Sequence, residues 1–330
     1  MAANLTPQYL KAQEEYRRAQ TAEEQVQWLE VMLKEIPKHK ASEKMQADLK
    51  TKLAKAKKDV EVERKSGHKG HSVKIPRQGA GTAVIIGGPN AGKSQLVCRL
   101  TRATPEVAPY PFTTRVPTPG MMPWEDVQVQ LIDTPPITTD FFEPYMQGLI
   151  RGSDVVLLLA DLGADEGIEQ LQELLDKLGG TKTRLAAASS LDEEDVGLSY
   201  TQTLLVANKI DAPDAAERLA LLHELCPLDF PEFAISAEQG TGLEELRGAI
   251  FRALDVVRVY TKTPTAKAAD MQRPFTIRRG GTVLDVAGLV HKDFIEQFKF
   301  ARVWRSSLHD GSQVKADHTP QDGEIVELHV

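Results

Sequence analysis

The sequence is poor in cysteine and in long apolar runs. Only two cysteines occur in 330 residues, Cys98 and Cys226, which excludes a disulfide framework and favours a reducing compartment with both thiols in the core. No apolar stretch approaches the roughly 20 residues needed to span a bilayer, and residues 1–10 lack the apolar segment of a signal peptide. The sequence therefore predicts a soluble, cytoplasmic protein with no membrane partner.

The chain also lacks the uniformly positive charge of many nucleic-acid binders, since its formal net charge is -7. The charge is nevertheless segregated. Residues 38–77 hold 13 Lys or Arg against 5 Asp or Glu, so this segment carries +8 and the remainder of the chain -15. Two interpretations stay open for the basic segment. It is either a solvated helix face or a surface for RNA phosphates, to which lysine and arginine give affinity without sequence information.

The length of the chain and its apolar spacing indicate three parts. We expect an N-terminal helical region and basic linker over residues 1–78, a larger domain over 79–256 and a smaller one over 257–330. Within the first part, the spacing predicts one helix from Pro7 to about Ile36 and a second one capped by Ser42, packed together as a helical hairpin.

Strands and helices alternate from Thr82 to about Leu254, which predicts an α/β domain with a mostly parallel sheet and helices on both faces. Ligands of such sheets bind at the carboxyl ends of the strands. The Ala-, Ser- and acid-rich stretch from Thr181 to Tyr200 predicts a long exposed loop. After Val257 the pattern predicts a compact α+β unit, in which Thr282 caps a helix.

The first strand of the α/β region leads into a glycine-rich loop. Residues 87–94 read G-x-x-x-x-G-K-S and follow the apolar run Ala83 to Ile86. Backbone N–H groups of such a loop bind phosphates, Lys93 can reach the β- and γ-phosphates, and the Ser94 hydroxyl can bind Mg²⁺. The motif predicts a nucleoside triphosphate site. Its predicted contacts are Gly87, Pro89, Asn90, Ala91, Gly92, Lys93, Ser94 and Gln95.

Two later loops indicate which base is bound. The sequence Asn-Lys-Ile-Asp at 208–211 directly follows a predicted strand, and Ser-Ala-Glu at 236–238 follows the next one. The Asp211 carboxylate can accept hydrogen bonds from N1 and the exocyclic amino group of guanine, which adenine cannot supply. A backbone N–H of the second loop can meet guanine O6. The predicted base contacts are Asn208, Lys209, Asp211, Ser236, Ala237 and Glu238.

A magnesium site and a nucleotide-dependent switch are predicted beside the phosphates. Asp133 ends a strand and is suited to hold a water on the Mg²⁺ that Ser94 coordinates. Thr113 and Thr114 lie between the first helix and the second strand of the domain, where a threonine completes the Mg²⁺ shell only when a γ-phosphate is present. We favour Thr114, so the predicted metal ligands are Ser94, Thr114 and Asp133. An ordinary loop hydroxyl is the alternative for either threonine.

These motifs resemble the five guanine-nucleotide motifs of the Obg-like and developmentally regulated GTP-binding proteins. Three further stretches are closer to the second group: His39 to Lys44, Val257 to Lys262, and Phe298 to Ser307 with residues 317–319. The last two resemble a TGS domain, a small β-grasp module. The resemblance implies a P-loop GTPase domain that binds GTP and GDP, with the basic helices and the TGS domain contacting ribosomes or RNA. We also expect a small stabilising protein partner.

The chain departs from the family pattern at its third motif. Relatives carry D-x-x-G there, and the glycine N–H binds the γ-phosphate, whereas Pro136 has no N–H to donate. A hydrogen bond to a charged group is worth roughly 1.5 to 3 kcal/mol. We therefore expect the coupling between the γ-phosphate and the second switch to be weak or rerouted.

The sequence also lacks a glutamine that would orient the attacking water, because Ile137 follows the glycine position. In several GTPases with the same loop sequence, an asparagine holds K⁺ beside the phosphates, which makes Asn90 a candidate ligand for K⁺. The alternative is that Asn90 only tolerates the loop's backbone.

The function predicted from the sequence is slow, Mg²⁺-dependent GTP hydrolysis in a ribosome- or RNA-associated switch, with K⁺ as a candidate stimulating ion. Lys93, Thr114 and Asn90 are its predicted catalytic residues. The alternative is a guanine-nucleotide-binding scaffold with little hydrolysis, which acts through its RNA-binding and TGS surfaces.

Overall fold

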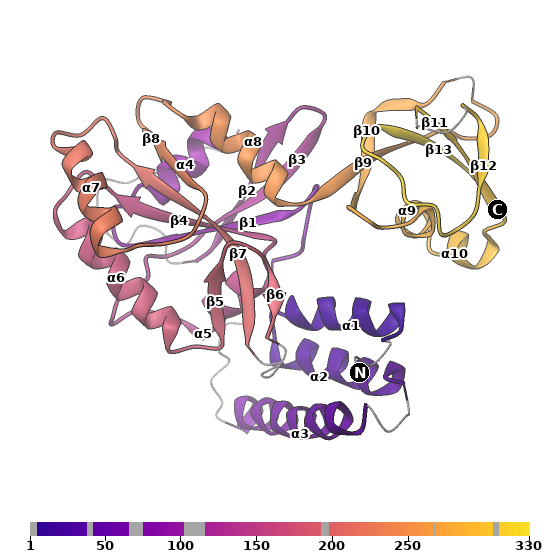
Figure 1. Cartoon of the computed structure of the whole chain (residues 1–330), viewed down its shortest axis with the longest axis horizontal. Helices are drawn as coiled ribbons and strands as arrows, with labels where there is room; N and C mark the ends of the chain where they lie inside the picture. The colour runs from indigo at the N-terminus through magenta and orange to yellow at the C-terminus, as the bar shows by residue number, and fades with distance from the viewer. Residues whose placement is uncertain are drawn as a thin grey trace.

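The computed structural model describes residues 5–37, 42–65, 75–101, 116–192, 198–266, 268–305 and 310–330, and for residues 59 and 62–65 it describes the backbone only. These residues form three units: N-terminal helices, a large sheet covered by helices and a smaller C-terminal sheet (Figure 1). Within the described residues, no helix is long and apolar enough to cross a membrane.

The N-terminal unit has three helices where the apolar spacing predicted two. They are α1 (Pro7–Arg17), α2 (Ala22–Glu35) and α3 (Glu43–Lys65). The prediction of one helix over residues 7–36 is wrong because Thr21 starts a new helix. Its hydroxyl accepts the Glu24 N–H, and the Glu24 carboxylate accepts the Gln20 N–H. This is a reciprocal capping arrangement, and it is visible in the sequence as Thr-x-x-Glu.

The apolar faces of the three helices share one core. Tyr9, Leu29, Met32 and Leu49 are at most 2% exposed and contact one another within it. Burial of each such side chain contributes on the order of 2 kcal/mol. The opposite face of α3, which carries lysines, is therefore exposed to solvent.

The large sheet confirms the predicted α/β class. Its strand order is β2-β3-β1-β4-β7-β5, and β6 and β8 also pair with β7. All pairs are parallel except β2 with β3 and β6 with β7. The strands are β1 (Thr82–Gly87), β2 (Thr118–Trp124), β3 (Val127–Asp133), β4 (Val155–Asp161), β5 (Thr183–Ala186), β6 (Ser190–Leu191), β7 (Ser199–Asn208) and β8 (Glu232–Ile235).

Helices cover both faces of this sheet, as alternating β and α segments require. The helices are α4 (Lys93–Leu100), α5 (Pro144–Gly152), α6 (Glu166–Gly179), α7 (Ala215–Leu225) and α8 (Leu243–Ala253). One core cluster joins α5, α6 and α7 to the sheet, and a second joins α4 and α8 to its other face (Figure 1). Because both faces are covered, β1 and β4 are buried along their whole length.

The predicted exposed loop from Thr181 to Tyr200 is wrong for its described residues. β5 and β6 lie within it, and β7 begins at Ser199. Three small hydroxyl residues, Thr183, Ser199 and Thr201, are fully buried there. The polar composition of this stretch predicted exposure to solvent, but threonine and serine side chains are small enough to be buried where strands pair.

The C-terminal unit is a second mixed sheet, with strand order β10-β9-β13-β11-β12. Its elements are β9 (Val256–Thr261), β10 (Asp270–Arg278), α9 (Val283–Val290), α10 (Asp293–Gln297), β11 (Phe300–Trp304), β12 (Ser312–Val314) and β13 (Glu324–His329). The predicted cap of α9 is confirmed, since Thr282 and Asp285 form a capping box. The α+β class predicted for this unit is also confirmed.

Arg258 of β9 joins the C-terminal sheet to the β2–β3 turn of the large one. It forms ion pairs with Glu125, Asp126 and Asp322, and Tyr260 donates its hydroxyl to Asp126. The hydrogen bonds from Arg258 hold the pKa of the Asp322 carboxyl below its usual value. The two sheets are therefore connected by a charged contact as well as by the chain itself.

Candidate nucleotide-binding site

The glycine-rich loop connects β1 to α4 in the conformation of a phosphate-binding loop. Gly92 adopts φ 89°, and Asn90 adopts φ 57°, so both lie in the left-handed region. A Cβ at Gly92 would come within 2.4 Å of Asn208 Nδ2, so only glycine fits there. The sequence after Gly92 starts α4, whose N-terminus therefore points at the loop.

Lys93 lies inside this loop. Its ammonium donates hydrogen bonds to Gly87 O at 3.1 Å and Gly88 O at 2.7 Å, and the residue is only 7% exposed. Burial lowers the pKa of Lys93 to about 8, while the negative charges of Asp133 and Asp161 oppose that shift. A buried ammonium at a helix N-terminus is a strong attractor for phosphate oxygens.

Ser94 and Asp133 meet beside the loop, as the sequence predicted for a magnesium site. The Ser94 hydroxyl, on the first turn of α4, donates to Asp133 Oδ2 at the end of β3 over 2.5 Å. A hydroxyl and a carboxylate are oxygen ligands of the kind that Mg²⁺ takes, with phosphates and waters completing its shell. Among the described residues, no group of three or more His, Cys, Asp or Glu forms a metal site.

The predicted switch residues Thr113 and Thr114 lie outside the described residues. The role assigned to Thr114 as a ligand of Mg²⁺ therefore stays a prediction.

Asn208 connects the phosphate loop with both predicted base loops. It is fully buried, its Nδ2 donates to Ala91 O at 2.9 Å, and its Oδ1 accepts the Ala237 N–H at 3.0 Å. These bonds hold the three loops in register. The amide N–H₂ and the amide oxygen each keep a second hydrogen-bonding position, so the predicted contact of Asn208 with the base stays a prediction.

The other predicted base residues lie at the same edge of the sheet. Asp211 and Glu238 are exposed, whereas Ser236 and Ala237 are buried. The Ser236 hydroxyl accepts the Gln239 N–H at 2.9 Å, which shapes the turn that presents Ala237. Asp211 is thus free to face a ligand from the solvent side, while Ser236 acts inside its own loop.

The segment after β3 explains how the chain accommodates Pro136. The next residue, Ile137, is 1% exposed in the core, and its N–H donates to Gly87 O at 3.2 Å. Thr134 is also buried and donates to Ile85 O. The segment is therefore bonded to the backbone of β1 and the phosphate loop, and the Ile137 side chain is packed in the core.

Sequence reasoning missed one charged residue of this site. Asp161, at the end of β4, pairs with Lys209 at 2.6 Å between Oδ2 and Nζ. The register of β4 and β7 places Asp161 directly beside Asn208. A signal was present, because an aspartate that ends a buried apolar strand lies at the same edge of the sheet as the nucleotide motifs.

Two sequence-family models match the chain. Residues 82–189 match a family described as 50S ribosome-binding GTPase, and residues 257–330 match the TGS domain. The first match covers the phosphate loop, the Ser94–Asp133 pair and Asp161. The second covers the C-terminal sheet.

Curated relatives match along almost the whole chain. An uncharacterized GTP-binding protein of Methanocaldococcus jannaschii is 28% identical over 93% of this chain and 92% of its own length. A developmentally regulated GTP-binding protein 2 homolog of Dictyostelium discoideum is 27% identical, with 92% of this chain and 98% of that protein covered. A ribosome-interacting GTPase 1 of Saccharomyces cerevisiae is 25% identical, with 93% and 99% covered.

The loops at the sheet edge, the two domain matches and these full-length relatives agree with the resemblance drawn from the motifs. The chain therefore contains a region of the 50S ribosome-binding GTPase family and a C-terminal TGS domain, and along almost its whole length it is similar to developmentally regulated GTP-binding proteins.

Proposed function

We propose that this protein hydrolyses GTP slowly on its own, with Mg²⁺, and works as a ribosome- or RNA-associated switch. The observation that carries the proposal is the junction of three loops at one sheet edge, bridged by Asn208. A phosphate loop alone would suit any nucleoside triphosphate. Its attachment to the loops that hold Asp211 and Ala237 sets guanine-selective groups at a fixed distance from the phosphates.

The phosphate end of the site suits phosphoryl transfer, which depends on positioning and on charge stabilisation. Lys93 and the loop N–H groups would bind the β- and γ-phosphates. Ser94 and Asp133 would hold Mg²⁺, which neutralises charge on the phosphate oxygens when bound. The predicted Thr114 would sense the γ-phosphate from the segment before β2.

Slow hydrolysis is expected because of the two residues at the predicted second switch, which follows β3. Pro136 cannot donate to the γ-phosphate, and the buried Ile137 cannot orient water. A positive charge placed beside the transferred phosphate, such as an arginine finger, is worth a factor of roughly 10³ to 10⁵ in rate. The missing acceleration would then come from a cation, from the ribosome or from both.

Asn90 is the proposed ligand of a stimulating K⁺. It is exposed on the phosphate loop with φ 57°, so its carboxamide lies outside the core. We expect GTP turnover in K⁺ to exceed turnover in Na⁺ by about tenfold or more, by analogy with the charge an arginine finger supplies. Steady-state phosphate release in matched chloride salts measures the ratio.

Asn90→Gly is the matched variant for this test, because glycine accepts the same backbone conformation and removes only the carboxamide. It should lose the K⁺ effect and keep its affinity for GDP. Equal turnover of the wild type in both salts would remove the potassium proposal. An unchanged ratio in Asn90→Gly would remove the role of Asn90.

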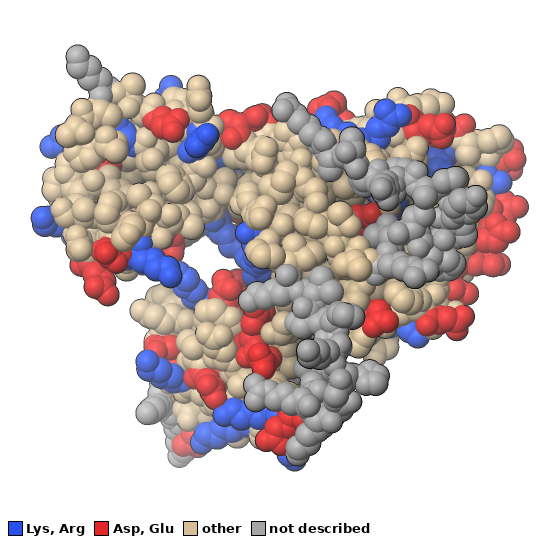
Figure 2. Space-filling view, turned by 180° about the vertical axis from the view of Figure 1, so that it is seen from behind, with Lys and Arg blue, Asp and Glu red and all other residues tan. Residues whose placement is uncertain are grey.

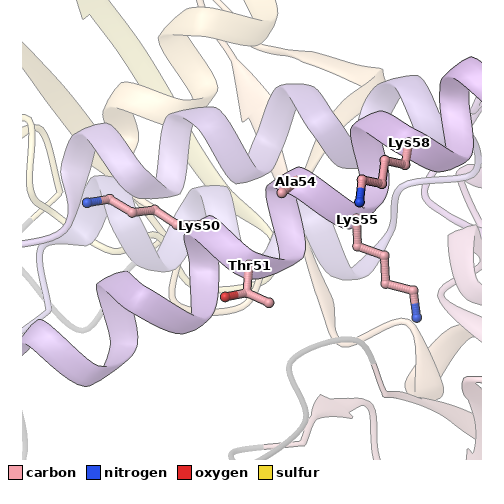
Figure 3. A pocket seen from close by; sticks show the side chains of 5 residues that line it. All are labelled: Lys50, Thr51, Ala54, Lys55 and Lys58. Atoms are coloured by element: carbon pink, nitrogen blue, oxygen red, sulfur yellow. The ribbon is translucent and has the colours of Figure 1, made fainter.

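The solvent face of α3 is the proposed contact for RNA. Lys50, Lys55 and Lys58 are exposed and, together with Thr51 and Ala54, line an open hollow of about 500 Å³ (Figure 3). The spacing places these residues on one side of the helix. Exposed lysines beside small residues suit a phosphodiester backbone, which needs positive charge but no shape-specific pocket.

The distribution of charge on the GTPase domain also supports α3 as the surface that contacts RNA. Figure 2 shows acidic side chains along the outer edge of the GTPase domain, away from the N-terminal helices. Exposed acidic residues lie on α6, among them Glu169, Glu173 and Asp176. An RNA phosphate backbone would be repelled from that edge and attracted to α3.

Replacing Lys50, Lys55 and Lys58 with alanine should weaken ribosome binding by about tenfold or more, because each phosphate contact releases counterions. The slope of log affinity against log salt should fall by roughly 2 to 3. Co-sedimentation with ribosomal subunits at several salt concentrations, with GDP and with a non-hydrolysable GTP analogue, measures both effects. The matched variant carries arginine at the three positions and should bind like the wild type. Wild-type binding by the alanine variant in every nucleotide state would contradict the proposed surface.

The contacts of α5 and of Asp154 link the region of the nucleotide site to the N-terminal helices. α5 follows the segment that starts at Asp133, and its buried Arg151 donates to the backbone oxygens of Tyr16 and Arg17 in α1. Just beyond α5, Asp154 forms ion pairs with Arg18 and with Arg278 of the TGS domain. A shift of α5 on hydrolysis would therefore move the N-terminal helices, which supports switching despite Pro136.

A second candidate function is a guanine-nucleotide-binding scaffold that barely hydrolyses GTP. The buried Ile137 and the Pro136 substitution favour it. Single-turnover hydrolysis with ribosomes present separates the two. A rate equal to that of buffer would select the scaffold, and a ribosome-stimulated rate would select the GTPase switch.

A further inference from the structure

Lys209 is held in an unusual backbone conformation and by a specific charged partner. It has φ 69°, which non-glycine residues adopt infrequently unless their surroundings impose it. Its Nζ lies 2.6 Å from Asp161 Oδ2, and Asp161 is 5% exposed. The main-chain hydrogen bonds between β4 and β7 already hold this part of the sheet together. The ion pair between the buried Asp161 carboxylate and the half-exposed Lys209 is therefore not needed for that purpose.

The other oxygen of the same carboxylate is also engaged. Gly163 N–H donates to Asp161 Oδ1 at 2.7 Å, which fixes the orientation of the carboxylate plane. A Cβ at Gly163 would come within 2.7 Å of Lys209 Cδ, so the absence of a side chain lets the lysine stem lie close to the backbone there. Asp161 and Gly163 thus form a cradle for the whole Lys209 side chain.

We infer that Asp161 is a positioning residue for guanine-nucleotide binding, which holds Lys209 in its binding conformation before the nucleotide arrives. This inference rests on the proposed guanine site. A free lysine would lose rotamer freedom on binding, and a lysine already fixed by Asp161 loses less, which favours affinity.

Asp161→Asn should weaken GDP and GTP binding by roughly tenfold each, mainly through faster dissociation. Asparagine retains an oxygen for the Gly163 N–H, so the fold should be kept. A fluorescent guanine nucleotide provides the equilibrium constant and the dissociation rate. The matched control is Asp165→Asn, which removes one charge from an exposed carboxylate paired with Arg218 and should leave both constants unchanged.

A double-mutant cycle separates positioning from a general structural effect. Lys209→Met keeps the apolar stem and removes the ammonium, so Asp161→Asn should have no further effect on affinity in that background. Full additivity of the two changes, or wild-type affinity in Asp161→Asn, would overturn the inference. Failure of the guanine site itself is distinguishable, because the wild type would then not prefer GDP over ADP.

Discussion

Replacing Asp211 with asparagine should lower the affinity for GDP and GTP by about 10³- to 10⁴-fold. Asp211 is exposed at the edge where the phosphate and base loops meet, so its carboxylate can face the guanine N1–H and amino group. Asparagine keeps one oxygen that can accept from N1–H, but it places an N–H₂ donor against the guanine amino group, which is itself a donor and loses its acceptor. Competition against a fluorescent guanine nucleotide measures the loss.

The same variant should gain affinity for xanthosine nucleotides, since xanthine has an oxygen where guanine has the amino group. This gain is the internal control, because a variant that merely unfolds binds neither base. Retention of guanine preference in Asp211→Asn would contradict the assignment of Asp211 to the base.

Removing the ammonium of Lys93 should lower affinity for GTP by on the order of 10³-fold, because it deletes charge-assisted hydrogen bonds in a site shielded from water. Lys93→Met keeps the stem that fills the loop. Isothermal titration with GDP and GTP measures the loss, which should be larger for GTP if the ammonium reaches the γ-phosphate. Near-wild-type affinity in Lys93→Met would contradict its role.

The pH dependence of binding provides an independent test of Lys93. Burial lowers its pKa to about 8, and phosphates bind the protonated form. Affinity should therefore be flat below pH 8 and fall as the pH rises above it, by up to about tenfold per pH unit until the pKa of the complex is reached. Lys93→Met should lack this alkaline fall. If the affinity of the wild type stayed constant up to pH 10, Lys93 would remain protonated in the nucleotide-free protein. This result would contradict the lowered pKa.

Local patterns in the sequence were sufficient for the α/β and α+β classes. The apolar run before Gly87 and the alternation that follows it predict β1, α4 and the parallel sheet, and the structure confirms them. The resemblance to the developmentally regulated GTP-binding proteins is confirmed by the domain matches and the full-length relatives. The sequence was sufficient for these predictions because each strand pattern and each motif consists of a few consecutive residues.

Errors arose where the local pattern was ambiguous. Continuous helical spacing hid the break at Thr21, although its capping signal was readable. Small polar residues after Thr181 resembled a loop because their burial depends on β5 and β6 pairing with β7. Two prolines within β2 also hid that strand, which sits at the edge of the sheet.

The chemistry proposed for the nucleotide site comes from the sequence, because the loop proposed to bind phosphates and the carboxylate proposed to read guanine are each specified by residue type at short spacing. The roles of Asn208 and Asp161 were decided by the tertiary structure alone. Asn208 bonds to Ala91 across 117 positions, and Lys209 to Asp161 across 48. Such contacts depend on which strands become neighbours in the sheet, and strand order is a property of the whole folded chain, set by burial on both faces.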